Sequence, residues 1–244
     1  MYKVTLLAVS LLAAAGSVDA ADLDQLQELG QDEFRKVSED LGSALSYKAL
    51  TPAEPMGTTG FDIGMEVTAT RLESPETFEL AMSGDDNFDT LPIAKLHAHK
   101  GLPFGIDVGA SYATVPSTNI KLLGAEIRYA LLEGGIATPA VAVRATYSTL
   151  QGVDQLDLNT RGLELTVSKG LTMATPYAGI GQVWVTSTPE NVTGAESVRL
   201  EEEDFSQSKA FVGMNFNLGL MNFLVEADKT GDATTYGAKL GFRF

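Results

Sequence analysis

Apolar residues recur at every second position along most of this chain, from Thr58 to the last residue. Alternation of this kind is the signature of β-strands with one apolar face, and it leaves little room for helices. In the segment 61–69, apolar side chains alternate with Asp62, Gly64, Glu66 and Thr68. The period predicts ten strands, at about 58–72, 91–100, 105–115, 119–132, 138–150, 160–170, 175–187, 207–218, 221–229 and 233–244. We therefore expect an all-β fold.

The strand lengths favour a membrane barrel. Most of these segments exceed the ~5–6 residues usual in soluble sheets, and a tilted lipid-spanning strand needs about 9–11. Each has an apolar face and a face of Gly, Ser, Thr and charged residues. That dyad pattern predicts a ten-stranded antiparallel transmembrane β-barrel with a short N-terminal helical segment.

The connections alternate in length. Those at 100–105, 133–137, 170–174 and 218–221 are short, whereas 73–90 and 186–206 are long and acidic. Counting back from a periplasmic Phe244, every long loop falls outside the cell, as bacterial barrels require. Strand one then starts on the periplasmic side.

The first residues form an export signal. Met1-Tyr2-Lys3 precedes an apolar run at 4–16, and Val18-Asp19-Ala20 supplies a cleavage site. This layout predicts a signal peptide at 1–20, because a spanning helix would need about 20 apolar residues. The chain divides into the signal peptide (1–20), an N-terminal helix and linker (21–57) and the barrel (58–244).

The C-terminal alternation carries a family resemblance. Tyr236, Ala238, Leu240, Phe242 and the terminal Phe244 resemble the assembly signal of bacterial outer-membrane β-barrel proteins. The resemblance implies location in the bacterial outer membrane and delivery by the barrel-assembly machinery. It also implies outer-membrane lipid and lipopolysaccharide as surroundings, but it identifies no subfamily.

Aromatic positions favour this barrel over a soluble periplasmic barrel or sandwich, whose apolar face would point inward. Tyr112 and Tyr147 fall near the outer strand ends, and Tyr129, Tyr177 and Phe242 near the inner ends. Two such girdles are typical of transmembrane barrels.

The composition excludes several function classes. With 17 Lys and Arg against 32 Asp and Glu, the net charge is −15, and no basic footprint for nucleic acid is present. Two His and no Cys leave few metal ligands, so no cofactor is expected. Nor is an enzyme expected. A nucleophile–base pair needs Ser or Asp beside His, and the nearest inward serine, Ser111, is expected toward the outer end of its strand, away from both His. Omptin-like proteases also have ten strands, but this chain has no His near the extracellular rim to act as the base.

Strand parity assigns fourteen ionisable residues to the barrel lumen: Asp62, Glu66, Lys95, His97, His99, Asp107, Glu126, Arg128, Arg144, Glu164, Glu226, Asp228, Lys239 and Arg243. Side chains fill eight-stranded barrels, and aqueous pores open at about 16–18 strands. These charges therefore form either a structural ion-pair network or the lining of a narrow ion or solute path.

His97 and His99 lie two residues apart on one strand face, so they could share a metal with Glu66 or Asp107. The alternative is a pair of interior polar groups.

The outer loops suggest a further role. Acidic residues gather in two of them: Glu73, Glu76, Glu79, Asp85, Asp86, Asp89 and the run 201–204. They either keep the loops soluble or bind calcium or magnesium through oxygen ligands. Such ions could bridge to lipopolysaccharide phosphates, and contact with another cell is a further alternative.

The segment 21–57 has a helical period, because Phe34, Val37, Leu41 and Leu45 recur at steps of three and four. A helix around 32–46 is expected, ended by the Pro-containing stretch 51–57. We expect this segment to plug the periplasmic mouth. The leading interpretation is a structural or narrow-pore barrel. A surface-binding module and a plugged conduit for lipid or apolar solutes are the alternatives.

Overall fold

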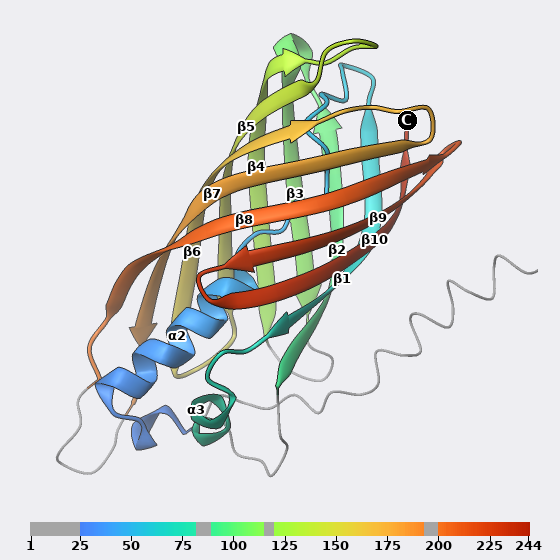
Figure 1. Ribbon diagram of the computed structural model, residues 1–244. Coiled ribbons are helices and arrows are strands. Elements are labelled where there is room, and N and C mark those ends of the chain that lie inside the picture. Colours follow the sequence, from blue (N-terminus) through green and yellow to red (C-terminus); the bar gives the residue numbers. More distant parts are fainter. Residues whose placement is uncertain (1–24, 82–88, 115–119, 193–199) are drawn as a thin grey trace, which may run out of the picture.

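The protein is a closed barrel of ten antiparallel strands, in which β1 pairs with β10 (Figure 1). The computed structural model describes residues 25–81, 89–114, 120–192 and 200–244, so the predicted signal peptide lies outside the described residues. The strands are β1 (Phe61–Arg71), β2 (Thr90–Gly101), β3 (Ile106–Thr114), β4 (Lys121–Glu133), β5 (Ala140–Gln151), β6 (Leu156–Ser168), β7 (Ala174–Pro189), β8 (Glu203–Leu218), β9 (Met221–Thr230) and β10 (Ala233–Arg243). The predicted fold class is confirmed.

Two strands begin about four residues earlier than the sequence pattern indicates. β6 starts at Leu156, paired with Pro189, and β8 starts at Glu203, paired with Ser187. In β6 the added residues do alternate, but Leu156 and Leu158 are buried and Asp157 is exposed, the reverse of the lipid-facing pattern used to predict the strands. They are extended nonetheless because β7, sixteen residues long, offers a partner over its whole length.

In the part of the chain that the structure describes, four short helical elements accompany the strands: η1 (Leu26–Glu28), α2 (Gln31–Leu45), α3 (Pro75–Leu80) and η2 (Pro103–Gly105). None of the helices in the described residues is long and apolar enough to span a membrane. The predicted helix at 32–46 corresponds to α2.

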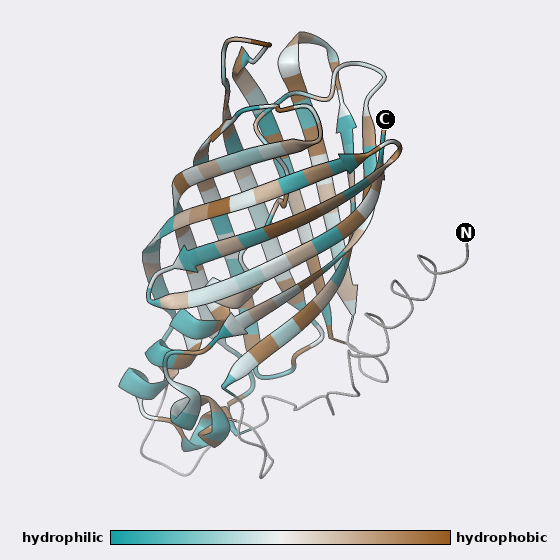
Figure 2. Cartoon of the chain, turned by 45° about the vertical axis from the view of Figure 1, so that its right-hand side comes forward, coloured by the Kyte–Doolittle hydropathy of each residue, from teal (hydrophilic) through white to brown (hydrophobic). Residues whose placement is uncertain are grey.

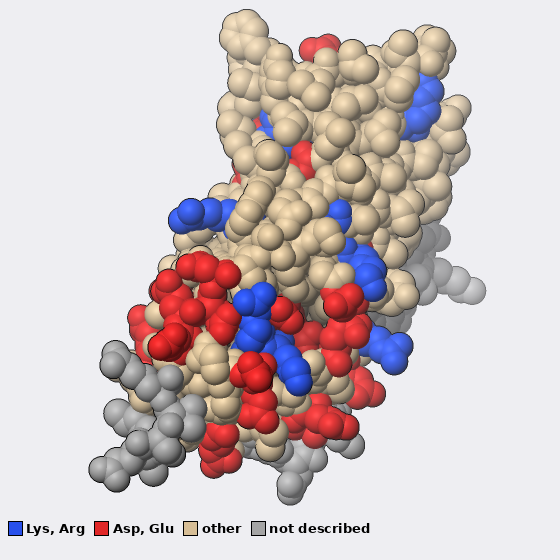
Figure 3. All heavy atoms as spheres, turned by 60° about the vertical axis from the view of Figure 1, so that its left-hand side comes forward, with Lys and Arg blue, Asp and Glu red and all other residues tan. Residues whose placement is uncertain are grey.

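The barrel wall is apolar outside and polar inside. On β1, Ile63 and Met65 are 45% and 44% exposed, whereas the alternating Asp62 and Glu66 are buried. Hydrophobic and hydrophilic residues alternate along the strands (Figure 2). The face seen in Figure 3 is mostly uncharged over the barrel body, and acidic residues gather at one end.

One predicted girdle residue faces the other way. Tyr177 is buried, and its hydroxyl donates a hydrogen bond to Glu226 Oε2 at 2.6 Å. Placing it among lipid-facing aromatics was wrong, because β7 turns its odd-numbered residues inward. Tyr112, Tyr129, Tyr147 and Phe242 are 40–59% exposed on the outer face.

The helix α2 lies at the end of the barrel where β1 joins β2, β5 joins β6 and β7 joins β8 (Figure 1). We call this the long-loop end, and the opposite one the Phe244 end. The apolar stripe of α2, from Phe34 to Leu45, is buried against Leu158 and Val185 of the wall and Phe78 of α3. A side chain at Gly42 would collide with Val185, since an added Cβ would lie 2.7 Å from its Cγ2.

The expected plug at the periplasmic mouth does not fit the helix if Phe244 marks the periplasmic side, an orientation that stays a prediction. The strand count predicts that the Phe244 end is periplasmic, and α2 occupies the opposite mouth.

Candidate functional site

The segment 46–57 connects α2 to β1 by running through the barrel lumen. Near the long-loop end, Lys48 Nζ lies 2.6 Å from Asp228 Oδ1. Further along, Thr51 Oγ1 accepts a hydrogen bond from Arg128 at 3.0 Å. At the Phe244 end, the Met56 N–H donates to Asp107 Oδ1 at 3.1 Å. The chain thus fills the space where a pore would have to be.

Apolar contacts also fix this segment. Leu50 is buried with Tyr177, Phe211 and Leu224 of the wall. The Ala53 N–H donates to Ser168 Oγ at 3.1 Å. Polar and apolar parts of the wall therefore both hold the linker.

The structure places thirteen of the fourteen predicted lumen residues in the buried interior, and Arg243 is half-buried. Their function as a pore lining stays a prediction. What the structure adds is their pairing, which divides into two groups along the barrel.

The first group lies around Glu164 and Asp228. Glu164 accepts from Lys209 at 2.6 Å and from Arg144 at 2.8 Å. Asp228 lies between Lys48, at 2.6 Å, and Lys209, at 3.6 Å. All these side chains are almost wholly shielded, so each charge depends on its partners for compensation.

The second group lies toward the Phe244 end. Asp107 pairs with Arg128 at 2.5 Å, Glu66 with Lys95 at 2.6 Å and Asp62 with Lys239 at 3.0 Å. Arg128 also donates to the Pro52 carbonyl oxygen on the threaded segment. Arg144 joins the two groups. It pairs with Glu164 in the first, and its Nε lies 3.1 Å from Oε2 of Glu126, which pairs with His99 in the second.

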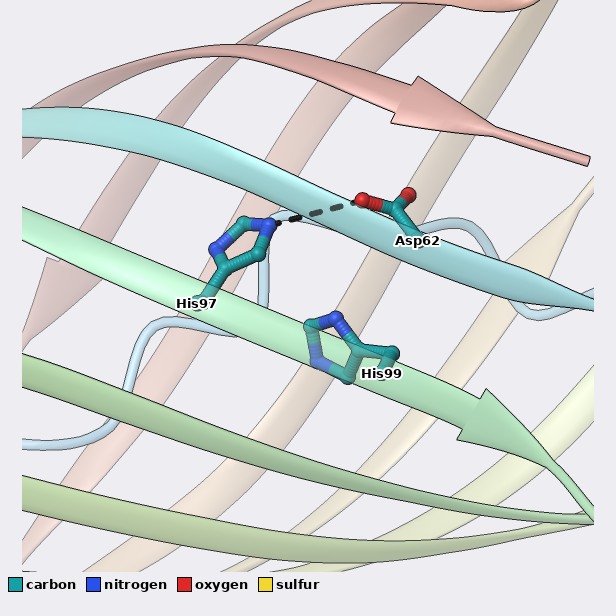
Figure 4. A group of neighbouring side chains, drawn as sticks. All are labelled: Asp62, His97 and His99. Carbon is teal, nitrogen blue, oxygen red and sulfur yellow. Dashed lines mark ion pairs between the residues drawn. The ribbon is translucent and has the colours of Figure 1, made fainter.

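The two histidines lie in this second group (Figure 4), and the centroids of their rings are 4.9 Å apart. His97 Nδ1 lies 3.0 Å from Glu66 Oε2, and its Nε2 lies 3.6 Å from Asp62 Oδ1. The expected partners Glu66 and Asp107 are engaged with Lys95 and Arg128. Asp62 is the carboxylate that completes a group of possible ligands with the two histidines.

Sequence reasoning missed several residues of the network, among them Lys209 on β8 and three on the threaded segment: Tyr47, Lys48 and Thr51. Lys209 lies within the predicted strand 207–218 and follows its inward parity, so parity alone could have found it. The other three lie in a stretch without a period, and nothing in the sequence marks their partners.

Asp40 caps the long-loop end. Its carboxylate accepts hydrogen bonds from the N–H groups of Glu73 and Ser74, both at 2.9 Å. Burial of this carboxyl nevertheless raises its pKa above the ordinary value. Asp40 thus ties α2 to the connection between β1 and β2.

Ser111 lies closer to the histidines than expected, because the β2–β3 register sets it opposite His97. Both side chains are buried in the filled lumen. A substrate would have to displace the threaded segment to reach them.

The predicted assembly-signal residues all face outward: Tyr236, Leu240, Phe242 and Phe244 are 39–67% exposed. Phe244 also closes the barrel seam. Its N–H donates to the Phe61 carbonyl at 3.0 Å, and Phe61 N–H donates back at 2.7 Å.

No protein-family model and no curated protein matches the sequence. Among solved structures, the chain is similar to the N-terminal β-barrel domain of OprF from Pseudomonas aeruginosa, with 14% identity, a TM-score of 0.38 and coverage of 77% of this chain and 99% of that one. The outer membrane protein OprG of the same organism is 13% identical, with a TM-score of 0.37 and coverage of 80% of this chain and 99% of that one. The KdgM porin is 8% identical, with a TM-score of 0.36 and coverage of 76% of this chain and 99% of that one. These neighbours are bacterial outer-membrane β-barrel proteins.

Proposed function

We propose that this protein is a structural barrel of the bacterial outer membrane that its own N-terminal segment holds closed. One observation carries the proposal: residues 46–57 occupy the lumen, and Lys48 on this segment neutralises the buried Asp228 of the wall. A segment that merely rested in a pore would not be needed to satisfy the charges of the wall.

The surface of the barrel supports the membrane location. Large apolar side chains stand outward on all sides, among them Leu96, Ile127, Leu163, Ile180, Val212 and Val225, at 39–64% exposure. A soluble protein rarely exposes an apolar surface of this extent. Since every strand pairs on both sides, no backbone edge would be left unsatisfied in lipid.

The filled lumen favours a closed barrel over the narrow-pore alternative. Its ion pairs also make it a poor passage for lipid or apolar solutes, because such a solute would have to separate buried charges. The acidic long-loop end (Figure 3) is the surface available for a binding role, which stays a prediction.

A reversible staple tests the proposal. Ser38 on α2 and Ser187 on β7 have hydroxyl oxygens 2.8 Å apart, and the chain has no cysteine of its own. The double variant Ser38→Cys/Ser187→Cys should therefore form a single disulfide that locks α2 to the wall. Each single-cysteine variant is the matched control, and heat-modifiable migration checks folding.

We expect no conductance in planar bilayers for the full chain, nor for the stapled variant, oxidised or reduced. Conductance that appears only after reduction would mean that the segment leaves the lumen, and the protein would be a gated pore. Conductance in both redox states would mean a path beside the segment. Either result would overturn the closed barrel.

A further inference from the structure

Three side chains near the Phe244 end converge at one point of the lumen. His97 and His99 come from β2, and Asp62 comes from the neighbouring β1 (Figure 4). One ligand atom from each lies within 4.8 Å of the others, and all three residues are buried. Among the described residues, Asp62 Oδ1, His97 Nε2 and His99 Nδ1 have no hydrogen-bond partner. Each such buried polar atom destabilises the fold unless something else satisfies it.

The hydrogen bonds around the group fix which atoms are left over. His97 directs Nδ1 at Glu66 Oε2, 3.0 Å away. His99 directs Nε2 at Glu126 Oε1, at 3.4 Å, and at the Tyr47 hydroxyl, at 3.3 Å. A carboxylate accepts but does not donate. The N–H of each neutral ring therefore points to its glutamate, and the lone pair lies on the opposite nitrogen.

This is the arrangement of metal-ligating histidines, which almost always donate the second ring N–H to a carboxylate, a carbonyl or water. Asp62 fits the same scheme. Its Oδ2 accepts from Lys239 at 3.0 Å and from Asn222 at 3.2 Å, so only Oδ1 remains free. Both ligand types have their outer partners in place.

Two glycines lie against the rings. An added Cβ at Gly109 would lie 2.2 Å from His99 Cδ2, and one at Gly64 would lie 3.3 Å from His97 Nε2. A side chain at Gly109 would displace the His99 ring, whereas one at Gly64 would first meet the Leu240 carbonyl oxygen, at 2.9 Å. Gly109 is therefore the position that leaves room for His99.

A proton does not satisfy this group completely. Protonated His97 would donate to Asp62 as well as to Glu66, which accounts for two of the three orphaned atoms. His99 Nδ1 would still be unpaired. A single cation held by all three atoms satisfies every one.

We propose that Asp62, His97 and His99 bind one divalent transition-metal ion of the zinc class. Two imidazole nitrogens and one carboxylate oxygen are a usual zinc donor set. At Zn–N and Zn–O distances of about 2.0–2.2 Å, tetrahedral ligands lie roughly 3.3–3.5 Å apart. The 3.6 Å between His97 Nε2 and Asp62 Oδ1 is already close to that value. The ion would join β1 to β2, and through His99 and Tyr47 it would stabilise the threaded segment.

The test uses the untagged full chain, since a polyhistidine tag would bind the same metals. The protein is unfolded in urea with EDTA and refolded with Zn²⁺ or with EDTA. Metal content is measured after desalting, and Co²⁺ serves as a probe of ligand geometry through its visible absorption. Because the lumen of the folded barrel is filled, the ion has to enter before the barrel closes. Metal is therefore added during refolding.

We expect one retained Zn²⁺ per chain, a tetrahedral Co²⁺ spectrum and a higher melting temperature with metal than with EDTA. His97→Gln, His99→Gln and Asp62→Asn should each lower the affinity at least about 100-fold, more than loss of an outer partner. Glu226→Gln, elsewhere in the same lumen, is the matched control and should retain the metal.

A full chain that refolds but retains no Zn²⁺ or Co²⁺ would overturn the proposal. So would retention by all three ligand variants. Because the full chain is measured with and without metal, the result stands even where a variant fails to fold. The outcome is also independent of the conductance experiment.

Discussion

Lys48 is the residue whose replacement tests most directly whether the linker is part of the barrel interior. Its ammonium lies 2.6 Å from Asp228 Oδ1, and both side chains are at most 2% exposed. Breaking a buried ion pair by removing one partner costs about 3–5 kcal/mol, because the other charge stays buried. Asp228 would keep Thr230 Oγ1 at 2.9 Å and Lys209 at 3.6 Å. We therefore expect Lys48→Met to lower the free energy of unfolding by about 3 kcal/mol, the low end of that range.

The matched control is Lys229→Met, one residue along from Asp228 on the outward, exposed face of β9. It should change the free energy of unfolding by less than about 0.5 kcal/mol, as surface substitutions usually do. Adding Asp228→Asn to Lys48→Met should recover more than half of the loss, because no unpaired carboxylate then remains. With Asp228→Asn measured alone as well, the four chains form a double-mutant cycle.

Urea unfolding in lipid vesicles measures these differences. The chain has a single tryptophan, Trp184, which is 46% exposed on the outer face of β7, so its fluorescence reports on contact with lipid. If Lys48→Met unfolds like the unchanged chain while the barrel is intact, the linker does not run through the lumen as described.

Three further predictions follow from the wall, the seam and the cap. On the lipid face, Val143→Arg should lower the free energy of unfolding by about 2–4 kcal/mol, and Val143→Leu by less than about 1.5 kcal/mol. Equal losses for the two variants in urea unfolding would refute the face assignment. Deleting Phe244 should impair assembly, because it removes the paired hydrogen bonds with Phe61, whereas Phe244→Tyr should assemble; heat-modifiable migration from cells measures both. Burial raises the folded pKa of Asp40, so the folded chain binds this proton more tightly than the unfolded one, and the free energy of unfolding should fall as pH rises from about 3.9 through the folded pKa. Asp40→Asn should lack that slope in urea titrations at several pH values.

The strands could be predicted because their signal is local. In β1, every inward residue from Asp62 to Thr70 is small or polar and the outward ones are apolar, so the period of two identifies the element and its faces together. The same parity placed Asp62, His97 and Glu126 on the inner side. Parity cannot say which inward charges meet, since that depends on the register between strands.

The position of the N-terminal segment could not be predicted for a physical reason. The strand count set the start of β1 at the periplasmic side, and we expected the preceding residues to stay there. Yet twelve extended residues span about 40 Å, more than the ~30 Å of a bilayer core. The segment 46–57 is thus long enough to cross the barrel and carry α2 to the far mouth. Nothing in the sequence around Thr51 and Pro52 indicates that Arg128 donates hydrogen bonds to them.

The segment and the wall are therefore one folding unit. Without residues 46–57, Asp228 would lose Lys48, Asp107 would lose the Met56 N–H, and Lys209 would lose the Tyr47 carbonyl oxygen. Water entering the emptied lumen could solvate some of these groups, but the apolar cluster around Leu50 would also be opened. Truncating the segment would change the stability of the barrel and the access to its lumen at the same time, so a truncated chain could not separate the two. A staple between α2 and the wall keeps every one of these contacts and changes only whether the helix can leave, which is why it isolates the question of closure.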